Sequence, residues 1–133
     1  MANFITYDAT GKITRKGYCQ ESDLPLQPQA GESVLDVTDS TVYDGTFTGC
    51  YVDSTGQVQV RTPIVYACPS TASVGTAVTL TAPAGTAVTI DGSSMGTIDS
   101  TGADSFTFAD AGTYAVSLSL WPYLDASFDV VAS

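Results

Sequence analysis

Carboxylates are the only plentiful side chains in this chain that could do chemistry. The 133 residues include 14 Asp and Glu but no His, so neither a Ser–His–Asp nor a Cys–His site can be built. Asp91, Asp99, Asp104 and Asp110 lie near predicted turns, where Asp usually bonds the local backbone. No Gly-rich loop followed by Lys-Ser/Thr points to phosphate binding. We therefore expect a protein that is not an enzyme.

Two further groups could bind a metal or react with an oxidant. The segment from Asp99 to Asp104 offers two carboxylates but lacks the twelve-residue EF-hand pattern, so we interpret it as a polar turn, with calcium binding as the alternative. Cys19, Cys50 and Cys68 lack metal-ligand spacing. We interpret them as buried free thiols, with a bridge between subunits as the alternative. We expect no metal and no cofactor.

The stretch from Ser105 to Leu120 predicts two alternating strands joined by an Asp-x-Gly-x-Tyr corner. Phe106 and Phe108 share one face before the corner. After it, one face carries Tyr114, Val116, Leu118 and Leu120, as a half-buried strand requires. A Tyr that opens a strand and bonds back to the backbone is the tyrosine corner of immunoglobulin-like sandwiches.

Residues 63–133 are therefore predicted to form an immunoglobulin-like β-sandwich, with the domain boundary at Thr62-Pro63. Val116 and Leu80 stand where the disulfide of antibody domains would be expected, so apolar packing must hold the layers together. Phe106, Phe108, Tyr114, Val116 and Leu118 are the expected centre. Short strands with turn residues between them are predicted at 64–68, 77–81, 87–91, 95–98, 105–108, 114–120 and 127–131.

Residues 1–62 are predicted to form a small β-hairpin domain, which makes the whole chain all-β. Two similar phrases, Asp8-Ala9-Thr10-Gly11 and Asp53-Ser54-Thr55-Gly56, predict two hairpins. Between them, Pro25 and Pro28 argue against a helix and against a central strand. Residues 33–37 could form a short strand, and residues 41–48 a turn flanked by extended pieces. About 62 residues with so much irregular chain bury little core, so we expect this domain to dock on a partner.

Charge and hydropathy exclude several classes of partner. The formal charge is −10, and all four basic residues precede Pro63, so nucleic-acid binding is not expected. No apolar run approaches the ~20 residues of a membrane span. The opening segment lacks both a basic start and a long apolar run, so we expect no signal peptide and a soluble product made in the cytoplasm.

The segment Trp121-Pro122-Tyr123-Leu124 is the densest apolar cluster outside a clean strand pattern. Pro122 should bend the chain at the end of its strand. Trp121 and Tyr123 either plug the end of the sandwich or its contact with the first domain, or anchor a partner.

The chain resembles a group of small virion proteins of tailed bacteriophages, usually encoded among tail genes. The shared phrases are Tyr7-Asp8-Ala9-Thr10-Gly11-Lys12-Ile13, Gly17-Tyr18-Cys19, Gln27-Pro28-Gln29-Ala30-Gly31-Glu32, Tyr51 to Pro63, Ala111-Gly112-Thr113-Tyr114 and Trp121-Pro122-Tyr123-Leu124-Asp125. The chain departs from the pattern at Ala111, where Pro is expected, and in a stretched segment before Arg61. The resemblance implies a virion component assembled in the host cytoplasm.

Three hypotheses for function follow. The first is a structural virion protein, present in several copies, which docks to tail or tail-fibre proteins through its first domain and displays the sandwich. The second is a capsid decoration protein, and the third is an adhesin module that binds a host surface glycan. The predicted partner-contact residues are Phe4, Tyr7, Tyr18, Trp121, Tyr123 and Leu124.

Overall fold

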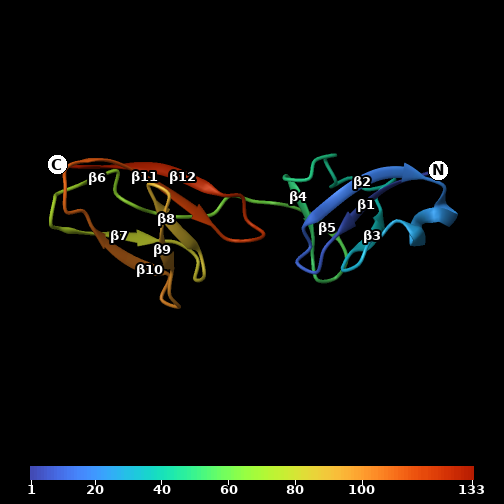
Figure 1. Cartoon of the computed structure of the whole chain (residues 1–133), viewed down its shortest axis with the longest axis horizontal. Helices are drawn as coiled ribbons and strands as arrows, with labels where there is room; N and C mark the ends of the chain where they lie inside the picture. Colours follow the sequence, from blue (N-terminus) through green and yellow to red (C-terminus); the bar gives the residue numbers. More distant parts are fainter. The chain divides into compact units, whose positions relative to one another are not determined.

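The computed structural model describes all residues from Met1 to Ser133 and is nearly all-β, which confirms the predicted fold class (Figure 1). The chain divides into two compact units, Met1–Arg61 and Thr62–Ser133. No helix in the structure has the length and apolar character needed to cross a bilayer.

The first unit packs a three-stranded antiparallel sheet against a short hairpin. The sheet has the order β2-β1-β3, with β1 at Ala2–Tyr7, β2 at Ile13–Cys19 and β3 at Ser33–Asp36. The hairpin joins β4, Cys50–Val52, to β5, Val58–Val60. One face of each element is apolar and closes a small core, whose buried members are Ile5, Ile13, Val37, Cys50 and Val52.

Both predicted hairpins form, and their turns have the same local structure. In each turn the Asp Oδ1 accepts hydrogen bonds from the backbone N–H and the hydroxyl of the Thr two residues later, at 2.9 Å and 2.6 Å. Each turn closes with a Gly at positive φ, 84° for Gly11 and 81° for Gly56. A residue with a side chain is strained at a positive φ, so glycine is favoured at this position. The Asp-x-Thr-Gly phrase therefore predicts this turn from local sequence alone.

The two glycines differ in what surrounds them. The Gly11 carbonyl accepts a hydrogen bond from the Val52 N–H at 2.9 Å, which ties the first turn to β4. A Cβ on Gly11 would lie 1.9 Å from the Val52 carbonyl oxygen, whereas a Cβ on Gly56 would meet nothing within 4 Å. Only a glycine allows the first turn to approach the second hairpin so closely.

The segment between the hairpins corrects one prediction and confirms another. Residues Glu21–Leu26 form a short 3-10 helix, η1, with Pro25 inside it, so the prediction that the prolines exclude a helix here is wrong. A 3-10 turn this short tolerates Pro25, because the hydrogen bonds at its ends come from the N–H groups of Asp23 and Gln27. The strand predicted at 33–37 is present as β3, while residues 41–48 contain bends and no strand.

The second unit is a sandwich of two antiparallel layers with one parallel edge strand. One layer pairs β7, Ala77–Thr81, with β10, Ala103–Thr107. The other has the order β6-β12-β11-β8-β9, and β6 runs parallel to β12. The bounds of these strands are Thr71–Ala72 for β6, Ala87–Ile90 for β8, Ser93–Thr97 for β9, Gly112–Ser119 for β11 and Ala126–Ala132 for β12. Pairing of β7 with β10 and of β8, β11 and β12 with one another matches the layers of an immunoglobulin-like sandwich (Figure 1).

The tyrosine corner forms as the sequence predicts. The Tyr114 hydroxyl donates a hydrogen bond to the Asp110 carbonyl at 2.7 Å. The Tyr114 ring packs on Phe108, with ring centroids 4.4 Å apart, and both side chains belong to the apolar core. Leu80 and Val116, at the places of the antibody disulfide, are both buried in the same apolar core. Apolar packing therefore joins the two layers at the position where a disulfide joins them in antibody domains.

One predicted strand of the sandwich is not continuous. In place of the strand predicted at 64–68, the structure has two isolated bridges, one from Pro63 to Leu124 and one from Ala67 to Thr81. These bridges reach a segment next to β12 at one end and β7 at the other, so this piece of chain crosses between layers instead of joining one sheet. The structure adds β6, which the sequence analysis did not predict, and pairs it with the end of β12.

The contrast between the two glycines gives a stability test. Gly56→Ala should cost only the left-handed backbone penalty, about 1–2 kcal/mol of unfolding free energy. Gly11→Ala must also displace the Val52 backbone, so we expect a loss of about 4 kcal/mol or more. Urea unfolding of the two full-length variants measures the difference. Equal losses would contradict the packing of the Gly11 turn on β4.

The second turn predicts a pH dependence. The hydrogen bonds from Thr55, Gln57 and Gln59 lower the pKa of Asp53 to about 2. A carboxyl with a depressed folded pKa stabilises the fold above its unfolded pKa, and this contribution is lost as the pH falls through about 2. NMR titration should find the Asp53 pKa near this value and a higher pKa in Gln59→Val. The Asp8 pKa, which is also lowered but without a Gln partner, should not change in that variant.

Candidate interaction surface

The strand β2 carries the surface that we identify as the best candidate site. Its residue Gly17 pairs with Phe4 on β1, and a Cβ on Gly17 would lie 2.5 Å from the tip of the Phe4 ring. The ring therefore covers the bare backbone of β2 and stays 5% exposed. On its other edge, β2 is paired with no strand.

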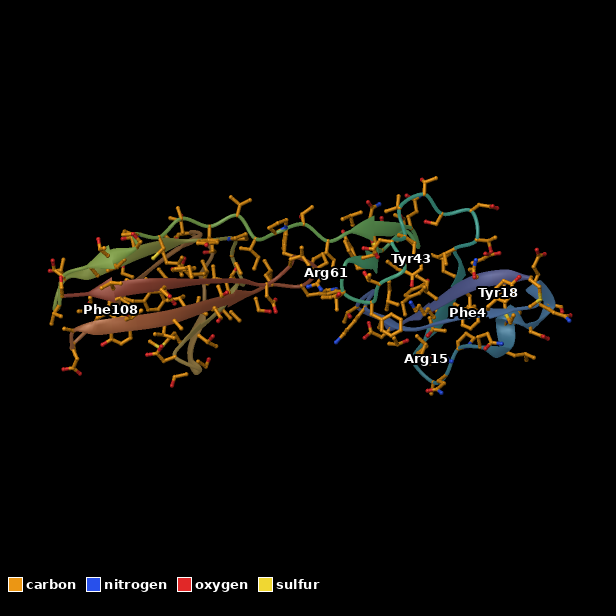
Figure 2. All side chains as sticks on the ribbon, turned by 90° about the horizontal axis from the view of Figure 1, so that it is seen from above. Phe4, Arg15, Tyr18, Tyr43, Arg61 and Phe108 are labelled. Carbon is orange, nitrogen blue, oxygen red and sulfur yellow. The ribbon has the colours of Figure 1, made fainter.

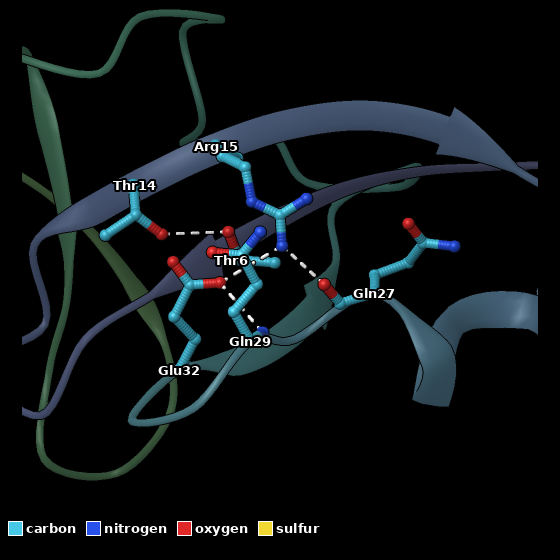
Figure 3. Close-up of polar contacts among 6 residues, drawn as sticks. All are labelled: Thr6, Thr14, Arg15, Gln27, Gln29 and Glu32. Carbon is cyan, nitrogen blue, oxygen red and sulfur yellow. Dashed lines mark hydrogen bonds and ion pairs between the residues drawn. The ribbon is translucent and has the colours of Figure 1, made fainter.

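On the same face as the Phe4 ring, β2 is also held by polar contacts (Figure 3). Arg15 donates hydrogen bonds to the Gln27 carbonyl and to Glu32 Oε1, the latter at 3.0 Å, and Glu32 also accepts the Gln29 N–H at 3.1 Å. The hydrogen bond from Gln29, followed by those from Thr14 and Arg15, lowers the pKa of Glu32. Together these contacts fasten the segment that carries η1 to the sheet.

On the core side, Lys16 links β2 to the loop between β3 and β4. Its Nζ donates to the Gly45 carbonyl at 2.8 Å and lies 5.9 Å from the centroid of the Phe47 ring, a cation–π contact. Between this loop and the sheet lies an open groove of about 640 Å³, which we call the first-unit groove. It is lined by Asn3, Phe4, Lys16, Gly17, Tyr18, Val37, Tyr43, Asp44 and Gly45.

Burial raises the pKa of two titratable groups near the first-unit groove, Tyr43 and Cys50. Burial raises the pKa of the Tyr43 phenol, and the charge of Asp44 adds to the shift. The Tyr43 hydroxyl is buried and has no hydrogen-bond partner (Figure 2). Burial likewise raises the pKa of the Cys50 thiol, which lies in the core with its Sγ 3.6 Å from the Val42 carbonyl. A protonated thiol is a poor nucleophile, so this cluster is suited to packing and not to covalent chemistry.

The three predicted contact residues of the first unit have different environments. Phe4 is buried beneath β2, so it supports the surface instead of forming it. Tyr7 is half-buried and packs against the core of the unit. Tyr18 is 61% exposed and lines the first-unit groove. Of the three, Tyr18 alone presents most of its side chain to solvent.

The three predicted contact residues of the second unit are all half-buried. Tyr123 packs against the sandwich core, and its N–H donates to the Leu120 carbonyl at 2.7 Å. The Leu124 N–H donates to the Thr62 carbonyl at 2.8 Å. Trp121 precedes Pro122 through a cis peptide bond. Tyr123 therefore contributes to the sandwich core, and the role of this segment as a partner anchor stays a prediction.

Several exposed apolar side chains were missed by the sequence analysis. Phe47 is 43% exposed beside Lys16, and Leu26 is 77% exposed at the end of η1. Both lie in irregular segments, where no alternation tells an inward from an outward residue. A large apolar side chain within a run of Gly, Ser, Thr and Asp, such as Phe47, was the available signal.

Three of the four carboxylates considered for catalysis or calcium binding, Asp91, Asp99 and Asp104, accept hydrogen bonds from backbone N–H groups. Asp99 accepts the Thr101 N–H at 2.9 Å together with its hydroxyl, and Asp104 accepts the N–H of Ser105 at 2.8 Å. Asp91 accepts the N–H of Ala115 at 2.8 Å. No group of three or more His, Cys, Asp or Glu residues is arranged to hold a metal ion. All three cysteines are free, with Cys50 buried and the other two half-buried.

Comparisons with known proteins add little. No protein-family model matches the chain, and no curated protein sequence matches it. One solved structure, described as "Structure of Protease", is similar at 19% identity and a TM-score of 0.44. That match covers 75% of this chain and 21% of the other, so this chain corresponds to about a fifth of that protein. A similarity this small indicates nothing about activity.

The polar side of β2 gives a test of how the surface is supported. Glu32→Gln removes the charge that Arg15 binds, so we expect the segment from η1 to β3 to loosen while β1 and β2 stay paired. Amide hydrogen exchange should accelerate several-fold at Gln29 and little at Gly17. The exposed carboxylate of Glu21 in η1 provides the matched control, Glu21→Gln. Equal exchange in both variants would show that the Arg15–Glu32 pair does not hold the segment.

Proposed function

We propose that the chain is a non-enzymatic structural component of a bacteriophage particle. Its first unit docks on tail or tail-fibre proteins, and its second unit is displayed as an immunoglobulin-like module. The observation that carries the proposal is the surface of the first unit, which combines exposed apolar side chains with an open strand edge at β2. Both features favour association with neighbouring chains.

The first unit exposes three large apolar or aromatic side chains, Tyr18, Leu26 and Phe47. Tyr18 is 61% and Leu26 is 77% exposed, and Phe47 adds a second aromatic ring close to Lys16. Aromatic side chains on the surface of a small unit are typical of interface anchors. The apolar core cluster of the unit has five buried members, so a partner would add stability that the unit lacks.

The second unit has the properties of a displayed module. It folds on a continuous apolar core of its own, closed by the tyrosine corner. Residues 63–133 contain six acidic and no basic side chains, which favours solubility and disfavours binding to phosphate backbones. The virion assignment itself depends on the resemblance of the short sequence phrases to phage tail-gene products.

Labelling of particles tests the proposal. Particles assembled from the genome that encodes this chain would be purified, labelled with an antibody against the chain and imaged by electron microscopy. We expect label on the tail or its fibres. Label distributed over the head would instead favour capsid decoration, and particles without label would refute a virion role.

A pair of matched variants tests the docking surface in the same particles. Tyr18→Ser combined with Phe47→Ser should reduce incorporation of the full-length chain, because it removes the two exposed rings near Lys16. Val65→Ser combined with Val131→Ser removes exposed apolar side chains from the second unit and should leave incorporation unchanged. Reduced incorporation only in the second variant would place the docking surface on the other unit.

A further inference from the structure

The outer edge of β2 can be located from the pairing of β1. Val37 donates its N–H to the Asn3 carbonyl at 2.8 Å, so the backbone groups of Asn3 point toward β3. Successive residues of a strand point their N–H and C=O groups to opposite sides, so Phe4 points toward β2. Phe4 pairs with Gly17, and Gly17 therefore bonds inward to β1.

The neighbours of Gly17 consequently point outward. The N–H and C=O groups of Lys16 and Tyr18 have no hydrogen-bond partner in the structure. Both side chains are exposed, and both line the first-unit groove on the core side of the sheet. The edge thus offers unpaired backbone groups beside a groove that could receive alternate side chains, which is the arrangement used in strand addition.

Several other edge strands of the chain are protected. On β10, the outward N–H of Ser105 is occupied by the carboxylate of Asp104 at 2.8 Å. The pairing of β9 with β8 contains an irregularity between Ala87 and Thr89. The edge strands β3, β5 and β6 have four residues or fewer. Short strands, bulges and charged side chains are the usual means of blocking edges. The strand β2 has seven residues, among them the charged Arg15 and Lys16, and its pairing with β1 is irregular only between Thr6 and Tyr7. From Arg15 to Cys19 its register is continuous.

The side chains of the edge indicate what would pair with it. Lys16 is at the centre of the strand, and its ammonium group contacts a carbonyl and an aromatic ring within its own unit. Asp44 is the acidic side chain that lines the same groove. A carboxylate directly opposite Lys16 on an added strand would form a favourable cross-strand pair, and Tyr18 would pack on an apolar side chain.

A second copy of this chain fits the edge poorly. Antiparallel pairing of two β2 strands about their common centre would place Lys16 opposite Lys16, and like charges directly opposite each other destabilise a sheet. The net charge of −10 on each copy adds a long-range repulsion. The charge pattern therefore favours a different chain with an acidic residue at the pairing position.

We propose that the β2 edge binds an extended segment of a partner protein by strand addition, with an acidic residue opposite Lys16 flanked by apolar residues two positions away. The inference rests on the proposed function, because it names the kind of segment that a docking partner would supply. It concerns the edge alone, so it can be tested apart from the particle.

Amide hydrogen exchange by NMR on the full-length chain tests the inference. The probe is the synthetic peptide Thr-Val-Thr-Glu-Thr-Val-Thr, and the control peptide has Lys in place of Glu. In the free chain the Lys16 and Tyr18 amides should exchange rapidly and the Gly17 amide slowly. Saturating amounts of the Glu peptide should protect Lys16 and Tyr18, and the Lys peptide should bind roughly three- to tenfold more weakly.

Two charge variants make the test specific. Lys16→Glu should reverse the preference between the two peptides, whereas Lys12→Glu, which makes the same charge change outside the strand, should keep the original preference. Absence of protection at Lys16 and Tyr18 with both peptides would overturn the inference. Protection that rises with chain concentration and without peptide would overturn it too, because the occupant would then be a second copy. Particle labelling decides the proposed function independently of either outcome.

Discussion

The close approach of the Gly11 turn to Val52 is the contact on which the first unit depends. It joins two hairpins that are distant in the sequence and allows their apolar faces to close around Ile5 and Cys50. Neither hairpin alone has enough apolar surface to be stable in water. Once the hairpins are joined, one face of the three-stranded sheet packs on the core. The outer edge of β2 then stays available to a partner.

The same side-chain device closes five turns of the chain. In each of them an Asp Oδ1 accepts both the N–H and the hydroxyl of the Thr two residues later. These turns begin at Asp8, Asp36, Asp44, Asp53 and Asp99. The hydrogen bonds from Thr lower the pKa of all five carboxyls. Five of the 14 acidic side chains therefore bond the backbone of the turns that they begin.

The strand β2 combines three environments within seven residues. Arg15 is tied to Glu32 on one face, and Lys16 reaches the loop at Gly45 on the other. Gly17 is covered by the Phe4 ring, and Tyr18 is exposed. Both faces are thus fixed by contacts within the unit, while the outer edge is not. A rigid strand with a free edge is pre-organised for pairing, because little conformational entropy is lost when a partner strand is added.

Local features of the structure follow from the sequence by itself. The alternation from Tyr114 to Leu120, the tyrosine corner and the two Asp-x-Thr-Gly hairpins each depend on residues within a few positions of one another, so their patterns are readable without a fold. Only the tertiary structure decided which of two similar turn phrases packs against another hairpin, since Gly11 docks on β4 and Gly56 faces open space. It also decided that Phe4 is covered while Tyr18 is exposed, and that residues 64–68 cross between layers. These outcomes depend on which distant segments lie beside each residue, and the local pattern of side chains carries no information about that.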